Sequence, residues 1–200
     1  VWKETRALPV ANMEELMDVL LAFQSLRTPA GRNAGVIGIG GGDAIQAADD
    51  LEMAGLKVPE LRPETQAAMR EFTPLPGTSV NNPLDLNVMR QGPELHRILQ
   101  LTASEDVIDI IVVVLRVDQT LGNPQGDKTF AEMMDTVEQF YATSPKPMAI
   151  VARALGSLES FATALKLQEK FDRAGVPVYP SITRAAGALG KYMRYVAPDL

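Results

Sequence analysis

The sequence predicts an α/β protein in which an open, mainly parallel sheet carries helices on both faces. Strand patterns alternate with helix patterns along the 200 residues, which is typical of right-handed βαβ units. Residues 107–115 form a nearly continuous β-branched apolar run, as expected for a strand buried on both faces. Three glycines at positions 40–42 join another apolar strand to an amphipathic helix. In such sheets ligands bind beyond the carboxyl ends of the strands, where this turn is expected.

The chain is organised around residues 35–55, a strand, a glycine turn and a helix. Val36, Ile37 and Ile39 predict a buried strand, and the helix after the turn ends at Gly55. The three glycines lack a Cβ, so the backbone can turn sharply and approach another group closely. Because first-turn N–H groups have no intrahelical partner and the helix end carries about half a positive charge, the turn is a candidate anion site. The pattern is equally typical of a plain strand-to-helix turn.

Ahead of this segment the sequence predicts one amphipathic helix over residues 13–23. Asn12 is a suitable N-cap, and turn-forming residues fill positions 28–33. We therefore place the main domain at residues 31–200 and interpret residues 1–30 as an N-terminal arm and helix, the tail of a preceding domain. The face expected to dock on another element comprises Leu16, Met17, Leu20, Leu21 and Phe23.

Between the glycine turn and the central strand, the pattern predicts a short edge strand, two helices and a long connection. Residues 56–61 are the edge-strand candidate, because prolines are excluded from a central ladder. One helix spans residues 63–72 and starts with a proline, and another spans 93–103. The connection over residues 73–86 is rich in Pro and Asn, and connections of this length are usually functional or disordered.

The second half completes the alternation around residues 107–115, which we expect at the centre of the sheet. Arg116 and Asp118 follow this strand at its carboxyl end, the edge of the sheet where ligands usually bind, and this position makes them site candidates. A turn-rich loop follows over residues 118–128. The remaining predicted elements are a helix at 129–141, a strand at 147–152, a helix at 158–174 ended by Gly175, a strand at 176–179, and a closing helix capped by Ser181 that runs to about residue 195.

The composition excludes several functional classes. With 46% hydrophobic and 22% charged residues, the chain has the composition of a soluble globular protein, and it holds no apolar run near the length of a membrane span. A net charge of −6 with scattered basic residues argues against nucleic-acid binding. The absence of cysteine excludes disulfides and thiolate metal sites and permits the cytoplasmic location that we expect.

Motifs of several enzyme classes are missing. The sequence has no GxSxG elbow, no Ser-His-Asp set, no metal-ligand cluster and no Gly-Lys-Ser/Thr phosphate loop. The dinucleotide fingerprint fails because Asp43 stands where the third glycine is required. The single histidine, His96, lies within a helical pattern and is expected to be solvated or partly packed. We therefore predict no catalytic residue and no metal site in this chain.

Several polar residues have both a structural and a functional interpretation. Asp43 lies in the first turn of the helix, where a carboxylate caps N–H groups, and the same charge would compete with a bound phosphate. Asn81, Asn82 and Asp85 are turn formers first and site candidates second.

An ordered series of motifs covers nearly the whole chain from about residue 10. The motifs are Gly-Gly-Gly opening a helix that contains Ala-Ala-Asp, then Ala-Gly-Leu-x-Val-Pro-x-Leu, Asn-Asn-Pro-Leu-Asp-Leu, Ile-Asp-Ile-Ile-Val-Val-Val, Lys-Pro-Met-Ala-Ile-Val and Gly-Val-Pro-Val-Tyr. Together they resemble the second flavodoxin-like, CoA-ligase domain of the NDP-forming acyl-CoA synthetases, relatives of succinyl-CoA synthetase and ADP-forming acetyl-CoA synthetase. The resemblance implies a flavodoxin-like three-layer sandwich.

The resemblance implies a reversible reaction in which an acid, CoA and a nucleoside triphosphate give acyl-CoA, nucleoside diphosphate and phosphate. In that family acyl phosphate and a phosphorylated histidine are intermediates, and the histidine lies on a neighbouring domain. The implied partners are the CoA-binding, phosphohistidine-bearing and ATP-grasp domains or subunits. CoA and ATP or ADP are expected to bind through those domains, with no tightly bound cofactor here. We do not expect the chain to be active alone.

Carried over to this sequence, the resemblance implies a phosphate-binding helix N-terminus with a polar loop beside it. Exposed Leu16, Leu20 and Phe23 would favour a homodimer if a preceding domain normally covers them. The predicted phosphate-binding residues are Gly40, Gly41, Gly42, Asp43 and Ala44, and the predicted site loop comprises Asn81, Asn82, Pro83 and Asp85.

Two departures from the family pattern favour other functions. Ile39 stands where the family commonly has asparagine, and Asp43 stands where it has a small or neutral residue. Lost amide hydrogen bonding and an added negative charge both disfavour phosphate, and they favour a non-catalytic regulatory or interaction module with the same fold. A flavin- or nucleotide-binding domain is a third alternative, but the first strand-to-helix loop lacks the hydroxyl-rich cradle expected for it.

Overall fold

A computed structural model describes residues 7–73, 76–86, 92–119 and 124–198 and confirms the predicted fold class. Five parallel strands form one open sheet in the order β2-β1-β3-β4-β5, which is typical of flavodoxin-like folds. The strand predicted to be central is the central strand, β3. The strands are β1 (Ala34–Gly38), β2 (Leu84–Asp85), β3 (Ile110–Arg116), β4 (Met148–Arg153) and β5 (Val178–Tyr179).

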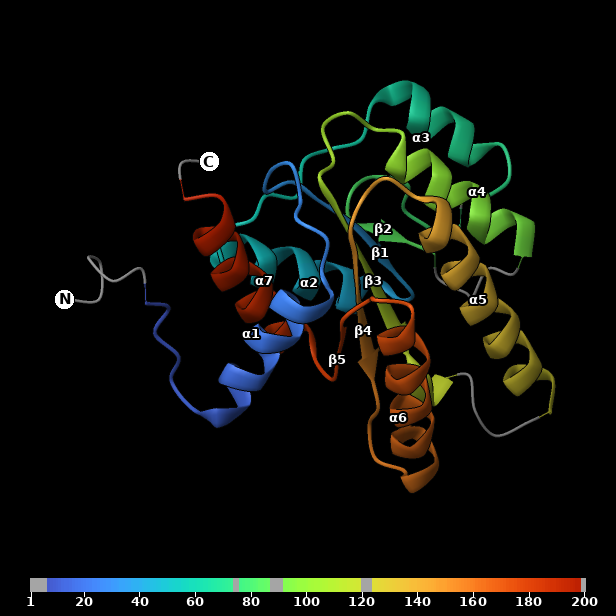
Figure 1. Cartoon of the computed structure of the whole chain (residues 1–200). Coiled ribbons are helices and arrows are strands. Elements are labelled where there is room, and N and C mark those ends of the chain that lie inside the picture. The colour runs from blue at the N-terminus through green and yellow to red at the C-terminus, as the bar shows by residue number, and fades with distance from the viewer. Residues whose placement is uncertain (1–6, 74–75, 87–91, 120–123, 199–200) are drawn as a thin grey trace.

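Helices cover both faces of the sheet, so the molecule has three layers (Figure 1). Side chains of β3 alternate between two apolar cores: Ile111 and Val113 face one, and Ile110 and Val112 face the other. No helix in the described part of the chain is long and apolar enough to cross a membrane. One layer contains α1 (Met13–Ser25), α2 (Gly41–Met53) and α7 (Ile182–Val196), and the other contains α3 (Pro63–Arg70), α4 (Gly92–Ala103), α5 (Pro124–Thr143) and α6 (Leu158–Arg173).

Helix starts follow the predicted capping residues. The Asn12 side chain accepts a hydrogen bond from the Glu15 N–H at 2.8 Å, and the Ser181 hydroxyl accepts one from the Arg184 N–H at 3.3 Å. Helix α5 begins five residues earlier than predicted, within the expected loop 118–128, of which residues 120–123 lie outside the described part.

The central strand starts later than its apolar pattern predicts. Ile110 is its first residue, because the Asp109 carboxylate accepts a hydrogen bond from the Asn33 N–H at 2.9 Å. The Ile108 N–H instead bonds the Glu105 carbonyl at 3.1 Å and closes a turn. Of the three residues that the prediction added, Ile108 is buried and Val107 is exposed, so the apolar pattern alone extended the predicted strand.

The predicted edge strand is wrong, and the true edge strand lies elsewhere. Residues 56–61 contribute only one isolated parallel bridge, between Lys57 and Asn33. Strand β2 lies instead within the connection predicted at 73–86, where Ser79 and Asp85 exchange two backbone hydrogen bonds. A two-residue strand carries too short a pattern to be found from sequence. Residues 74–75 of that connection lie outside the described part.

The predicted apolar face of α1 is only partly right. Leu21 packs against the core as predicted, and the Phe23 ring, although exposed on one side, lies edge-on to Tyr192 and Tyr195 of α7 with ring centroids 5.0 and 5.1 Å apart. Met17 and Leu20 are exposed, and the buried apolar residues are Val19 and Ala22, which the prediction left out. Helix α1 packs on α7, although the predicted domain boundary at residue 30 stays a prediction. The reason for the rotation is Asp18, which is buried because its carboxylate accepts two hydrogen bonds from Arg184, at 2.7 and 2.8 Å.

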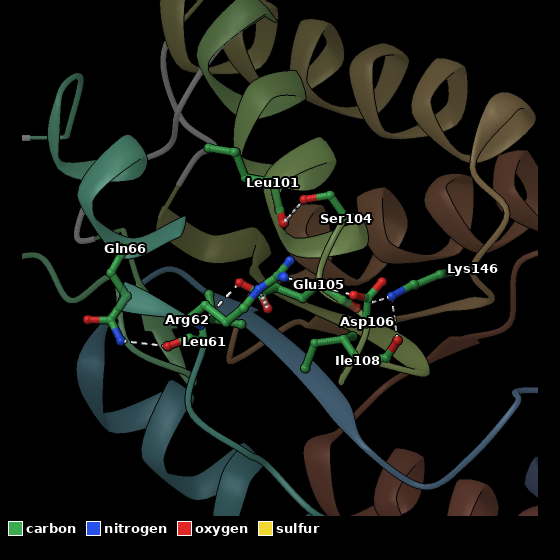
Figure 2. Close-up of polar contacts among 9 residues, drawn as sticks. All are labelled: Leu61, Arg62, Gln66, Leu101, Ser104, Glu105, Asp106, Ile108 and Lys146. Carbon is green, nitrogen blue, oxygen red and sulfur yellow. Dashed lines mark hydrogen bonds and ion pairs between the residues drawn. The ribbon is translucent and has the colours of Figure 1, made fainter. Parts of the chain in front are cut away.

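Polar contacts fix the connections at the amino-terminal edge of β3 and β4 (Figure 2). The fully buried Glu105 carboxylate accepts hydrogen bonds from the Arg62 N–H and Nε at 3.1 and 2.9 Å. Lys146 Nζ donates to the carbonyls of Glu105 and Ile108. Burial lowers the pKa of Lys146 from its ordinary value, against the opposing effect of the Asp109, Asp106 and Glu105 carboxylates. This cluster lies at the end of the sheet opposite to the glycine turn.

Candidate functional site

The glycine turn lies at the carboxyl edge of the sheet, as predicted. Gly40 is the N-cap of α2 and has φ of +104°, a conformation that side chains other than glycine rarely adopt. Its N–H donates to Asp85 Oδ1 at 2.9 Å, and a Cβ at Gly41 would lie 2.9 Å from Asp85 Oδ2. The structure therefore brings Asp85, from the predicted site loop, directly against the predicted phosphate-binding turn.

Asp43 forms ion pairs with two arginines in front of this turn. Arg153 Nη1 donates to Asp43 Oδ1, and Arg116 Nε lies 3.5 Å from Oδ2. We call these three residues the arginine cluster. Arg116 was a sequence candidate by position, and the structure confirms that it reaches the turn. The carboxylate complements the helix end, but it also neutralises one of the two guanidinium charges.

Strand register explains why the two arginines converge. Arg116 and Arg153 are the last residues of β3 and β4, and they are register partners in the parallel ladder. Because side chains alternate along a strand, both point to the face covered by α2 and α7. Sequence reasoning missed Arg153 because the predicted strand ended one residue earlier. The available signal was that both strand patterns are followed immediately by arginine.

Asn82, in the predicted site loop, bonds the backbone of β1 and does not reach the glycine turn. The buried Asn82 amide donates to the carbonyls of Ala34 and Pro59 and accepts from the Val36 N–H. Asn81 is exposed, and the peptide bond between Asn82 and Pro83 is cis. Asn82 thus lies along the β1 edge rather than at the glycine turn.

Two other sequence candidates position neighbouring segments. Asp118 accepts two hydrogen bonds from the Leu155 N–H, at 2.9 and 2.8 Å, and so ties the segment after β4 to the segment after β3. His96 is partly buried and lies edge-on to Phe140, with ring centroids 5.9 Å apart, in agreement with the partly packed role expected for it.

An apolar surface adjoins the same edge of the sheet. Leu155, Leu158, Phe161 and Leu165 are exposed after β4 and along one face of α6. Phe161 and Leu165 line a pocket of about 190 Å³ together with residues at the ends of β4 and β5. Contiguous apolar surface of this kind is typical of interaction sites.

The glycine turn allows a paired test of backbone and packing. Gly40→Ala is expected to lower the free energy of unfolding by about 1–2 kcal/mol, because alanine is strained at a positive φ. Gly42→Ala is expected to raise it by about 0.5–1 kcal/mol, because the added Cβ meets nothing within 4 Å and helix propensity improves. Urea unfolding of both variants checks these values. Equal effects would contradict the turn geometry.

The comparisons support the resemblance that the sequence predicts, because curated relatives at low identity are ADP-forming acetate–CoA ligases or their subunits, and solved structures share the fold. The chain is 25% identical over 196 residues to the ADP-forming acetate–CoA ligase II of Archaeoglobus fulgidus, which covers 98% of this chain and 27% of that relative. It is also 25% identical over 207 residues to subunit alpha of the ADP-forming acetate–CoA ligase I of Pyrococcus furiosus, and this match covers 97% of this chain and 39% of that subunit. No protein-family model matches.

The chain spans only part of these relatives, 27% and 39% of their lengths.

Solved structures show the same fold. The crystal structure of PH0766 from Pyrococcus horikoshii OT3 matches with a TM-score of 0.79 and 23% identity, over 98% of this chain and 43% of that one. The apo dinucleotide-forming acetyl-coenzyme A synthetase 1 of Candidatus Korarchaeum cryptofilum matches with a TM-score of 0.74 and 20% identity, over 98% and 40%.

Proposed function

We propose that this chain is a domain or subunit of an NDP-forming acyl-CoA synthetase and holds a phosphoryl group at the N-terminus of α2. The full enzyme would convert acid, CoA and nucleoside triphosphate reversibly into acyl-CoA, nucleoside diphosphate and phosphate. The observation that carries the proposal is the glycine turn at the sheet edge, in a chain similar to ADP-forming acetate–CoA ligases along nearly its whole length.

The proposed contribution of this chain is electrostatic. First-turn N–H groups of a 13-residue helix point out of its N-terminus without intrahelical partners, and the helix dipole favours an anion there. Such preorganised donors would hold the phosphoryl group of a histidine borne by another domain, without proton transfer by this chain. The N–H groups of Gly41, Gly42 and Asp43 are the proposed donors, with Gly40 forming the turn. The Ala44 N–H, which the sequence analysis included, donates instead to the Gly40 carbonyl at 3.2 Å and closes the first helical turn.

Other domains would supply the remaining chemistry. We propose CoA-binding, phosphohistidine-bearing and ATP-grasp domains as partners, with CoA and ATP or ADP bound there and a cytoplasmic location for the assembly. The names of the relatives make acetate and ADP the first substrates to assay. The exposed apolar surface on α6 offers a face against which a partner domain could pack.

Titration of the chain with inorganic phosphate tests this proposal. We expect amide NMR shifts centred on Gly41 to Ala44 at millimolar phosphate, because backbone donors and the helix dipole act within the first turn. Chloride at equal ionic strength is the control for general salt effects. The proposal fails if these four amides do not respond to phosphate more than to chloride.

The second candidate function is a non-catalytic interaction module with the same fold. The ion pair between Asp43 and Arg153 favours it, because a carboxylate in the first turn of α2 already neutralises one of the charges that would attract phosphate. This module would bind a partner through its apolar surface and would not respond to phosphate, so the same titration separates the two functions.

A further inference from the structure

In the arginine cluster, two guanidinium groups hold the two oxygens of one carboxylate, that of Asp43 in the first turn of α2. Arg153 Nη1 donates to Asp43 Oδ1, and Arg116 Nε lies 3.5 Å from Oδ2. The Asp43 side chain is only 13% exposed, whereas those of Arg153 and Arg116 are 22% and 35% exposed. The carboxylate is thus more enclosed than the two cations that surround it.

The carboxylate fits this position incompletely. Among the described residues no hydrogen-bond donor reaches Asp43 Oδ2, although that oxygen is shielded from water. Its 3.5 Å contact with Arg116 exceeds the usual length of an N–H···O hydrogen bond. A carboxylate has two oxygens, whereas a phosphoryl group presents three, and guanidinium groups bind such oxyanions through parallel N–H bonds. A phosphoryl group could therefore bond both arginines and the first-turn N–H groups together.

The charge balance around the turn leads to the same conclusion. Arg116 and Arg153 carry two positive charges, and Asp43 and Asp85 carry two negative charges, so the four groups sum to zero. Asp85 is held by the Gly40 N–H at the side of the turn. If Asp43 alone withdraws, the site gains one net positive charge, to which the helix end adds about half a charge.

We infer that Arg116 and Arg153 are side-chain ligands of the phosphoryl group, and that Asp43 occupies its place until the group enters. This inference rests on the proposed function, to which it adds two ligands from β3 and β4 beside the backbone donors of α2. It also gives Asp43 a defined role. The carboxylate keeps the two guanidinium groups in place and makes the site selective for anions that can displace it.

The test is a phosphate titration of the wild-type chain, Asp43→Asn and the matched control Asp49→Asn. Asp49 is exposed on the same helix and is not part of the arginine cluster. We expect Asp43→Asn to bind inorganic phosphate about tenfold or more tightly, because it removes a negative charge a few ångströms from the anion. Asp49→Asn should bind as the wild type does. The Nε–H resonances of both arginines should shift on addition of phosphate only in those proteins that bind it.

Further variants separate ligand binding from a structural role. Adding Arg153→Gln to Asp43→Asn should abolish the gain in phosphate affinity and the shift of the Arg116 resonance. Asp43→Ser serves as a second variant if Asp43→Asn proves unstable in thermal unfolding. Amide shifts at Gly41 to Ala44 that are equal in wild type and Asp43→Asn would overturn the inference and leave the proposed function standing. No shift in any protein would overturn both.

Discussion

Replacing Asn82 with alanine is expected to lower the free energy of unfolding by about 3–5 kcal/mol. Strand β2 pairs with β1 only at Ile37 and Gly38, so the edge of β1 before these residues has no strand beside it. The Asn82 amide replaces that strand. It accepts from the Val36 N–H at 2.8 Å and donates to the carbonyls of Ala34 and Pro59 at 2.7 and 2.9 Å.

The large effect follows from what the truncation leaves behind. Alanine would leave one buried N–H and two carbonyls without a hydrogen-bond partner, and each unpaired buried group costs about 1–3 kcal/mol. Urea unfolding measures the loss, with Asn81→Ala as the matched control. Asn81 is exposed, and its replacement should change stability by less than about 0.5 kcal/mol. Asn82→Asp should also destabilise, because it turns a carboxylate oxygen toward two carbonyls. A loss below 1 kcal/mol in Asn82→Ala would contradict this account.

The parts of the fold that sequence predicted are those determined by local pattern. The strand, glycine turn and helix at residues 35–55, the caps Asn12 and Ser181, and the central position of β3 all depend on residues close together in the chain. Such features carry their own signal, because capping and strand burial depend on neighbouring residues.

The features that sequence missed depend on distant partners. Helix α1 turns Asp18 into the core because Arg184, 166 residues away, binds its carboxylate. The sequence marks Asn82 as a turn former, but its side chain lies along an edge of β1. There it accepts a hydrogen bond from the N–H of Val36, which is 46 residues earlier in the chain. No local pattern contains either pairing.

The candidate site divides in the same way. The turn at Gly40 was predictable from residue type, and so was the position of Arg116 after the central strand. The ion pair between Asp43 and Arg153 required the register of β3 against β4, which no single segment encodes. It decides how the departure at Asp43 is interpreted, because a charge that repels phosphate in isolation is balanced here by two arginines.

Glu105→Gln is expected to lower the free energy of unfolding by about 2–3 kcal/mol. The carboxylate is 0% exposed and accepts hydrogen bonds from both the backbone and the side chain of Arg62 (Figure 2). Glutamine keeps the shape but presents an N–H₂ group to one of these donors. Breaking a fully buried ion pair costs about 3–5 kcal/mol, and the cost is smaller here because Arg62 is 54% exposed and can be rehydrated.

Asp106→Asn is the matched control for this prediction. The Asp106 side chain is 96% exposed and lies 3.8 Å from Arg62 Nη1, so its replacement should cost less than about 0.5 kcal/mol, and raised salt should reduce the difference further. Glu105→Gln should retain its full cost at high salt, because water and ions do not reach the buried carboxylate. It should also lower the pKa of Lys146 further, since the Glu105 charge opposes the effect of burial. Equal losses for the two variants would mean that the Arg62 contact acts as a surface ion pair, and that the segment before β3 is held by apolar packing instead.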